Sequence, residues 1–321
     1  MKKLLFILIA INLLFVACDD ENSGTGSIQM YVEPEWTITQ GIEAGEGPEK
    51  MHDGWSLSYE RFVISLGDIY VTKSSENAKE FRMDNNYVID LKNAPSSGLV
   101  VAEFSNVPSG DWDRVGYSML AANSDSQKLG GISDDLFNEM VDHQLAVSAR
   151  MVLSNPSGQV CPYDLEGDNP IDPQRPCIDR NEVILDWELP FPAKAEGCMT
   201  PSQVGLTVPS GGTAQIKLTI HADHHFFTAM RHTDIQRLAQ PVIDADLNED
   251  GFITLEELQQ VPVAVLDPAV YDLSTFPQLE TLYDYVRWTT ITFPHYQGDG
   301  GCPERTPLDG GENLEENKHQ H

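Results

Sequence analysis

The residues with the clearest capacity for chemistry are the twelve from Asp246 to Glu257, DLNEDGFITLEE. Oxygen-bearing side chains occupy the first, third, fifth, ninth and twelfth positions, and a glycine occupies the sixth. Ca²⁺ prefers a shell of oxygen ligands, which short Asp and Asn side chains spaced two residues apart can supply within one tight turn. Gly251 permits the positive φ that bends the chain around an ion. The segment therefore predicts a calcium-binding loop.

The order of these residues resembles the loop of EF-hand proteins, which implies a defined ligand set. By that resemblance the calcium ligands would be Asp246, Asn248, Asp250, the backbone carbonyl of Phe252, Thr254 and Glu257. Ile253, at position eight, would anchor the loop to a packed neighbour. The pair Thr254 and Glu257 also matches a helix capping box. That alternative leaves the Asp-x-Asn-x-Asp-Gly run unexplained.

The loop stands alone in the sequence. The acidic segment DLEGDNPID, residues 164–172, carries Asn169 where an EF-hand requires glycine. Dockerin modules have similar loops, but these usually carry Asp at position twelve and occur in pairs. Calcium sensors also pair two hands to open a groove. A single loop in an exported protein suits a weaker site, on the order of 10⁻⁴–10⁻³ M, so we expect calcium to be structural.

A second group of candidate ligands lies in the segment HADHHFF. His221, Asp223, His224 and His225 offer two or three imidazoles with a carboxylate, which would suit Zn²⁺ or Cu²⁺. The alternative is structural: these histidines would hydrogen-bond backbone groups where a strand passes into a helix. In that case Asp223 could orient one of the imidazoles.

The layout is similar to that of uncharacterised bacterial lipoproteins in which a β-sandwich runs into an HxDHxF-like segment followed by one EF-hand. His221, Asp223, His224 and Phe226 match such a segment. The resemblance implies no known activity.

The N-terminus predicts export and lipid anchoring. A short basic start precedes the apolar run 4–16, which is too short to span a bilayer and reads as a signal peptide. Its end, LFVAC, resembles a lipobox, in which Ala17 precedes a lipidated Cys18; Phe15 departs from the usual Leu. Secretion with ordinary cleavage is the alternative. Acyl chains on Cys18 would hold the protein at a membrane of the bacterial cell envelope, facing the periplasm or the exterior.

The cysteine count agrees with an oxidising compartment. If Cys18 is lipidated, four cysteines remain, which allows two disulfides. We expect Cys161–Cys177, which closes a short loop, and Cys198–Cys302, which joins the tail to the core. A zinc site is the rival, but no CxxC pair exists and the spacings are irregular.

Short runs rich in Val, Ile, Tyr and Phe, separated by Gly, Pro, Asn and Ser, continue to about residue 220. They predict a mainly β fold, an antiparallel β-sandwich over 28–225 behind a flexible tether at 19–27. A helical region carrying the calcium loop would follow over 226–296, and a polar, disordered tail over 297–321.

Four helices are expected within this frame. They cover 133–143 with Ser133 as its cap, 228–240, 255–261, and about 275–291 with Ser274 or Thr275 as its cap and Pro277 in its first turn. The last helix would bury Leu279, Leu282, Tyr283 and Val286.

Composition narrows the class of function. With 20 Lys and Arg against 50 Asp and Glu, the formal charge is -30, which makes nucleic-acid binding untenable. No motif of a serine hydrolase, zinc protease, phosphate-binding loop or redox pair is present, so we expect no enzyme.

The expected function is that of a calcium-binding, lipid-anchored binding or scaffold protein. The alternatives are a copper or zinc protein using 221–225, and an extracellular hydrolase of unrecognised type. For the latter, DWD (111–113) and DWE (186–188) are candidate carboxylate pairs, although strand-edge positions suit them better.

Overall fold

The computed structural model describes residues 24–74, 79–165, 176–230, 235–276, 278–309 and 314–315. The expected signal peptide, Cys18 and most of the tether lie outside these residues, as do Pro277, residues 166–172 of the acidic segment and the end of the tail. No helix among the described residues is long and apolar enough to cross a membrane.

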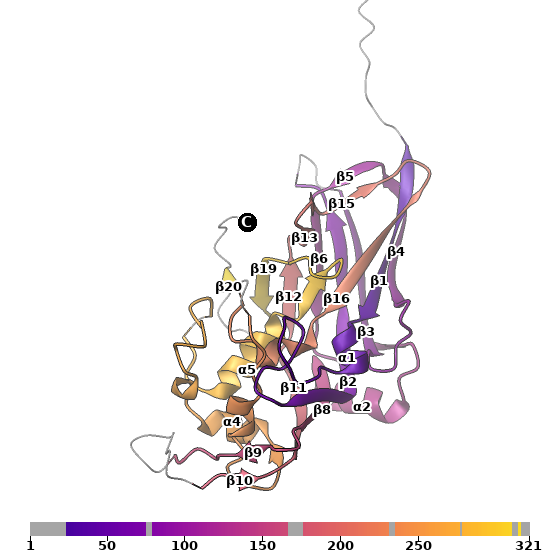
Figure 1. Ribbon diagram of the computed structural model, residues 1–321. Coiled ribbons are helices and arrows are strands. Elements are labelled where there is room, and N and C mark those ends of the chain that lie inside the picture. The colour runs from indigo at the N-terminus through magenta and orange to yellow at the C-terminus, as the bar shows by residue number, and fades with distance from the viewer. Residues whose placement is uncertain are drawn as a thin grey trace, which may run out of the picture.

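The fold is mainly β, as the sequence predicts, and is built on two large sheets (Figure 1). The four-stranded sheet has the order β18 (Pro294–Tyr296), β16 (Thr213–Ile220), β1 (Thr25–Pro34), β4 (Leu99–Pro108). The ten-stranded sheet runs β17 (Phe252–Ile253), β11 (Glu182–Leu189), β8 (Val147–Ser154), β2 (Ser56–Thr72), β6 (Arg114–Met119), β12 (Ala193–Glu196), β19 (Glu304–Pro307), β20 (Leu314–Glu315), with β3 (Glu80–Asp90) on β2 and β7 (Gln127–Leu129) on β3.

Three small strand pairs and seven short helices complete the described structure. The pairs are β9 (Gln159–Val160) with β10 (Ile178–Asp179), β13 (Met199–Thr200) with β14 (Gln203–Val204), and β5 (Gly110–Trp112) with β15 (Leu206–Val208). The helices are α1 (Trp36–Gln40), α2 (Asp134–Asp142), η1 (Ala222–Phe226), α3 (Gln240–Ile243), α4 (Leu255–Gln260), η2 (Val263–Val265) and α5 (Leu282–Ile291).

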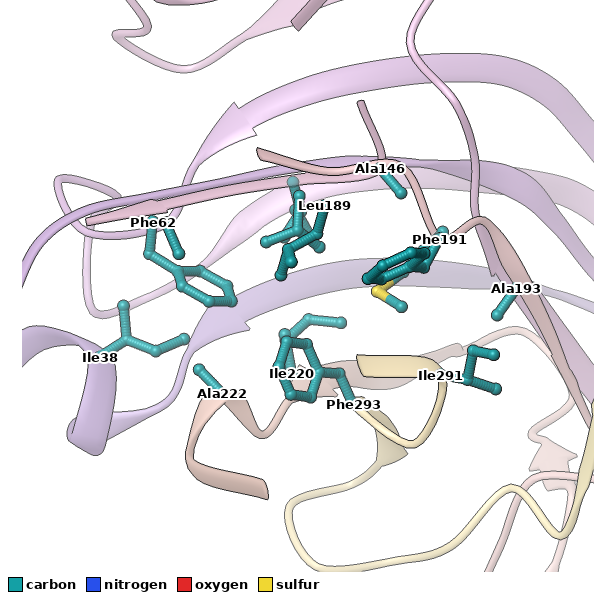
Figure 2. Packing of buried hydrophobic residues seen from close by; sticks show 14 of the residues in the cluster. Ile38, Phe62, Ala146, Leu189, Phe191, Ala193, Ile220, Ala222, Ile291 and Phe293 are labelled. Carbon is teal, nitrogen blue, oxygen red and sulfur yellow. The ribbon is translucent and has the colours of Figure 1, made fainter. Parts of the chain in front are cut away.

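The two sheets enclose one hydrophobic core, to which alternate residues of their strands contribute. Met30 of β1 and Ile220 of β16 share this core with Phe62 of β2 and Leu189 of β11; Figure 2 shows three of these side chains together with Phe293. Pairing is mostly antiparallel, but β1 pairs with β16, β3 with β7 and β11 with β17 in parallel. Parallel neighbours require long crossover connections, and each of these pairs is far apart in sequence.

The helical region does not form a core of its own. Val242 of α3, Leu258 of α4 and Val286 of α5 belong to the same cluster as the sheet residues. Figure 1 shows α4 and α5 gathered beside the strands. After α5 the chain returns to both sheets as β18 and β19, so residue 225 marks a change in sequence character and not a boundary between cores.

Two expected helices are confirmed. Helix α2 begins after Ser133, whose side chain accepts a hydrogen bond from the Leu136 backbone. Its Met140 packs with Val63 in a small second cluster on the outer face of the large sheet. Helix α4 begins after Thr254.

Two other helix expectations need correction. Of the helix expected over 228–240, residues 231–234 lie outside the described residues. The flanking segments pair with each other: the Thr228 amide donates to the Gln236 carbonyl and the Leu238 amide to the Phe226 carbonyl, and helix begins only at Gln240. This strand-like pairing replaces the helical bonds that the spacing suggested. Helix α5 starts at Leu282 instead of 275, because Thr281 forms a capping box with Asp284.

The two expected disulfides are present. Cys161–Cys177 closes a separation of 16 residues and Cys198–Cys302 one of 104. The expectation of a disordered tail is wrong for residues 297–309, because β19 pairs with β12 next to the second disulfide. The charged composition concealed this strand, whose Arg305 is buried.

The long-range disulfide is expected to contribute more to stability than the short-range one. In the chain-entropy account, closing a loop of 104 residues stabilises the folded state by about 5 kcal/mol. Closing a loop of 16 residues stabilises it by about 3 kcal/mol. The double variant Cys198→Ala/Cys302→Ala should therefore lose more free energy of unfolding in urea than Cys161→Ala/Cys177→Ala. Equal losses in the two variants would contradict this ranking.

Candidate metal sites

The predicted calcium loop lies between two short helices. Helix α3 ends shortly before Asp246, and α4 begins after Thr254, as the EF-hand arrangement requires. Gly251 has φ +87°, the left-handed conformation that its position demands. Thr254 and Glu257 form the capping box that is the alternative interpretation of this pair.

Hydrogen bonds close the loop from within. The buried Asp246 carboxylate accepts from the backbone amides of Asp250 at 3.0 Å and Gly251 at 2.9 Å. Glu257 reaches back, and its Oε1 accepts from the Leu247 amide at 3.0 Å. With their oxygens held in this way, Asp246, Asp250 and Glu257 do not converge into a group whose ligand atoms all lie within 4.8 Å of one another.

The strand inside the loop pairs with the edge of the large sheet. Phe252 and Ile253 form β17, in register with Ile184 and Leu185 of β11. The Ile184 amide donates to the Gly251 carbonyl at 2.9 Å. Ile253 is buried, as the sequence predicts for position eight. The sheet thus provides the pairing that a second hand would otherwise give this strand.

One basic neighbour, Arg180, offsets part of the negative charge of the loop. Arg180 places its Nε 3.8 Å from the Asp246 carboxylate and donates from Nη2 to the Glu249 carbonyl at 2.5 Å. Burial raises the pKa of Asp246 above its ordinary value, although the amides of Gly251 and Asp250 and the Arg180 charge oppose this. Asp246, Asp250 and Glu257 carry three formal charges, which Arg180 and one divalent cation would neutralise.

The histidine segment is positioned by the four-stranded sheet. His221 follows β16 directly, and η1 carries Asp223, His224 and His225. The structure brings His221 and His224 together with His295 of β18, with one ligand atom from each within 4.8 Å of the others. A second such group joins His221 and Asp223 to Glu35.

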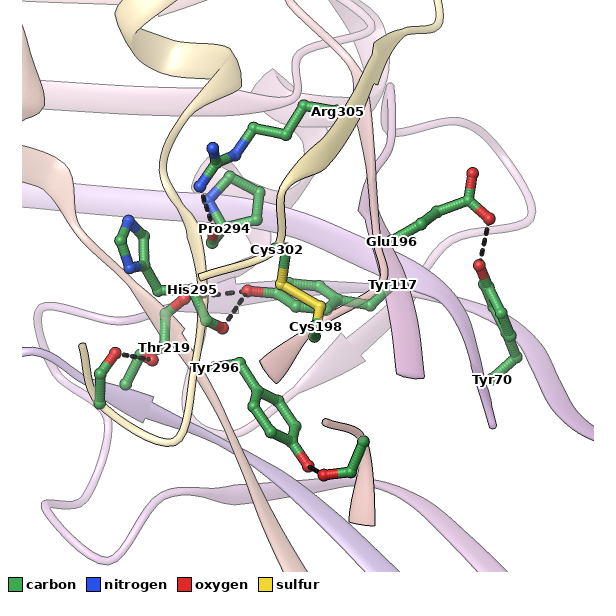
Figure 3. The surroundings of a disulfide bond; sticks show 12 residues. Tyr70, Tyr117, Glu196, Cys198, Thr219, Pro294, His295, Tyr296, Cys302 and Arg305 are labelled. Atoms are coloured by element: carbon green, nitrogen blue, oxygen red, sulfur yellow. Dashed lines mark hydrogen bonds between the residues drawn. A yellow bond between two sulfur atoms is a disulfide. The ribbon is translucent and has the colours of Figure 1, made fainter. Parts of the chain in front are cut away.

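His295 reaches the group through strand register. It pairs with Thr219 on β16, so His221 lies diagonally opposite on the same sheet face. The rings of His221 and His295 are 4.0 Å apart between centroids. Tyr117, from the other large sheet, fixes the backbone here: its hydroxyl lies 2.7 Å from the His295 carbonyl and 3.0 Å from that of Thr219 (Figure 3).

His225 lies outside both groups and has a structural environment. Its Nδ1 lies 2.9 Å from the Thr289 hydroxyl, and its ring packs edge-on against Trp187 and Phe293. Burial lowers the pKa of His225 to about 3, so the ring is neutral near pH 7. For this residue the structural alternative fits better than metal ligation.

Protonation of His224 and His295 is also disfavoured. Burial lowers the pKa of His224 well below its ordinary value, reinforced by His295, His221 and Arg305. Burial likewise lowers the pKa of His295, and the nearby His221 and Arg305 lower it further. The Gly300 backbone acts in the opposite direction, although neither ring nitrogen of His295 makes a hydrogen bond to a described residue. Neutral imidazoles are the form that binds metals.

The carboxylates beside His221 are held by an arginine. Arg237 donates from Nε to Asp223 Oδ2 at 2.6 Å, and both side chains are buried. Burial and the charge of Asp223 raise the pKa of Glu35 to about 8, while a hydrogen bond from Thr37 and the Arg237 charge oppose this. The Tyr59 hydroxyl and Asp223 Oδ1 lack hydrogen-bond partners among the described residues.

Sequence reasoning missed two members of these groups, His295 and Glu35. They lie 74 residues after and 186 residues before His221 in the chain. His295 stands alone between Pro294 and Tyr296, and only the β16–β18 register reveals its place. The DWE segment is part of strand β11 and does not form a pair of facing carboxylates. Trp187 is buried, and Asp186 forms ion pairs with Arg61 and Arg150.

No family model, no curated protein and no solved structure matches this chain.

Loss of Arg237 should be strongly destabilising, because it leaves the buried Asp223 carboxylate without its opposite charge. We expect Arg237→Met to reduce the free energy of unfolding in urea by about 3–5 kcal/mol. The exposed pair Arg114–Glu304 gives a matched control: Arg114→Met should cost less than about 1 kcal/mol. Asp223→Asn combined with Arg237→Met should lose less than the two single changes summed. Strict additivity would contradict the coupling.

Proposed function

We propose that this protein is a calcium-binding lipoprotein of the bacterial cell envelope, anchored through lipid on Cys18, that acts as a binding or scaffold protein. Calcium would be structural, holding the 246–257 loop on the edge of the large sheet. The two disulfides support an oxidising compartment. The acidic composition supports an acidic, solvated surface.

The observation that carries the calcium proposal is the buried Asp246 carboxylate facing into the loop. A buried carboxylate is costly unless an opposite charge and hydrogen bonds compensate it. Two backbone amides and the more distant Arg180 provide part of that compensation. A divalent cation bound by Asp246, Asp250 and Glu257 would provide the rest.

Occupation of the loop requires the carboxylates to exchange partners. Asp250 Oδ1 accepts from the Phe252 amide at 2.8 Å, and Glu257 Oε2 accepts from the Thr254 amide and hydroxyl, each at 2.9 Å. A bound ion competes with these bonds, which reduces the net gain. This supports a dissociation constant on the order of 10⁻⁴–10⁻³ M, the range of extracellular calcium modules.

Glu257→Gln tests the assignment, with Glu256→Gln as its matched control. Glu256 is the neighbouring residue and is exposed. We expect calorimetry to show that Glu257→Gln loses most calcium affinity while Glu256→Gln retains it. Wild-type protein in calcium at about ten times the dissociation constant should gain about 1.4 kcal/mol, a melting-temperature rise of a few degrees that EDTA abolishes. An unchanged titration in Glu257→Gln would reject the loop as the site.

Calcium should also protect the strand pairing that holds the loop. The Ile184 amide, which donates to the Gly251 carbonyl, should exchange its hydrogen more slowly in calcium than in EDTA. Amides in the β1–β16 pairing, such as that of Met30, should not respond. Equal effects at both places would indicate general stabilisation without a local role for β17.

A further inference from the structure

We propose that His221, His224 and His295 bind a single transition-metal ion, copper or zinc. This site is separate from the calcium loop and does not depend on it. It differs from the set expected from sequence, since His295 replaces His225.

The backbone that carries the three rings is fixed from several directions. His221 and His295 are diagonal neighbours on paired strands, and the His221 amide donates to the Phe293 carbonyl at 3.0 Å. His224 approaches from η1, with its ring 5.2 Å from that of His295 and 5.6 Å from that of His221. Two nitrogens that share a zinc or copper ion lie at most about 4.2 Å apart, given bond lengths of about 2.0–2.1 Å. Ligand atoms within 4.8 Å of one another can reach that spacing by small side-chain rotations.

The hydrogen bonds assign a metal-binding tautomer to His224. Thr292 donates its hydroxyl hydrogen to the Thr289 carbonyl at 2.6 Å, so its oxygen must accept from His224 Nδ1, 2.8 Å away. This leaves the lone pair of His224 on Nε2. An imidazole that donates its other N–H to a fixed oxygen is the usual form of a metal ligand.

His295 supplies the strongest sign of a missing partner. Both of its ring nitrogens are shielded from solvent, and neither has a hydrogen-bond partner among the described residues. Buried polar atoms in folded proteins are nearly always bonded, so an orphaned pair on one ring calls for an explanation. A metal ion would give one of the two nitrogens its partner.

A fourth ligand would come from the side of His221, which is partly open to solvent. His221 retains 13% side-chain exposure and Glu35 12%, and Glu35 Oε1 lies 3.6 Å from His221 Nδ1. Arg237 holds Asp223 through Oδ2, and Asp223 Oδ1 has no hydrogen-bond partner among the described residues. Three imidazoles and a position open to water or Glu35 match the ligand number of zinc sites. Imidazole nitrogens favour copper and zinc over calcium or magnesium.

The test is calorimetric titration of the full-length mature chain, stripped with chelator and then held in millimolar calcium so that the loop is filled. Zn²⁺ and Cu²⁺ are titrated separately. We expect one ion per chain, bound more tightly than about 1 µM. His295→Ala and His224→Ala should each weaken binding by about 100-fold or more, beyond the 10–100-fold that loss of an outer hydrogen bond costs.

Three control variants separate this site from other histidines. His143→Ala removes an exposed ring paired with Glu188, His225→Asn keeps a donor for Thr289, and His319→Ala/His321→Ala removes the two histidines at the end of the chain. All three should bind the ion as the wild type does. Loss of binding only in the tail variant would overturn the proposal, as would wild-type affinity weaker than about 10 µM.

A spectroscopic readout guards against variants that fail to fold. Electron paramagnetic resonance of Cu²⁺-loaded wild type should show coupling to three nitrogens, and folded His295→Ala should show two. Fewer than three in the wild type would overturn the triad without recourse to any variant. Glu257→Gln should keep the same signal, so a failure of the calcium proposal and a failure of this one remain distinguishable.

Discussion

The short antiparallel pairing of β18 with β16 is the constraint on which the C-terminal part of the molecule depends. It joins segments about 75 residues apart in sequence, and it is held from the opposite sheet by the Tyr117 hydroxyl. Once the pairing forms, Cys302 lies beside Cys198 and β19 can join β12 (Figure 3). The same register carries His295 to the face of His221. The Cys198–Cys302 disulfide, the β12–β19 pairing and the position of His295 beside His221 therefore all depend on the pairing of β16 with β18.

The 246–257 loop covers part of the edge of the large sheet. A strand such as β11 exposes unpaired backbone groups if nothing covers it, which invites association with other chains. Two residues of the loop occupy part of that edge as β17. The Trp187 indole, on β11, donates to the Ile253 carbonyl at 2.8 Å and adds a side-chain bond to the backbone pairing. The β11 strand thus gives this single EF-hand-like loop the pairing partner that a second loop would otherwise supply.

Trp187 also connects the two regions of candidate chemistry. Its ring packs on His225, whose neighbour His224 belongs to the histidine group. The interior between the sheets is consequently not uniformly apolar: Asp223, Arg237, His224 and His225 are all buried within or beside the main cluster. Burial of that many polar groups costs stability unless each is paired. Hydrogen bonds to Arg237, Thr289 and Thr292 offset most of this cost in stability.

The sequence by itself determined the features that depend on local spacing. The mainly β class, helix α2 with its Ser133 cap, helix α4 and the residues of the 246–257 loop follow from periodicity, capping and turn chemistry, which act over a few residues. The disulfide pairing was expected but not determined by sequence, because four cysteines allow three pairings and only the structure selects one. Helix α5 shows the limit: an earlier cap was expected at Ser274 or Thr275, whereas the capping box of Thr281 with Asp284 starts the helix at Leu282.

Tertiary structure alone decided what comes together from afar. Glu35 and His295 join His221 through the register of strands distant in the chain, and a one-residue shift in register would turn His295 to the opposite face. Residues 304–307 are polar enough to suggest disorder, yet the neighbouring disulfide and the free edge of β12 place them in a sheet. His225 looked equivalent to His224 in sequence; successive side chains on η1 point in different directions, and only the packing of Trp187 and Phe293 separated them.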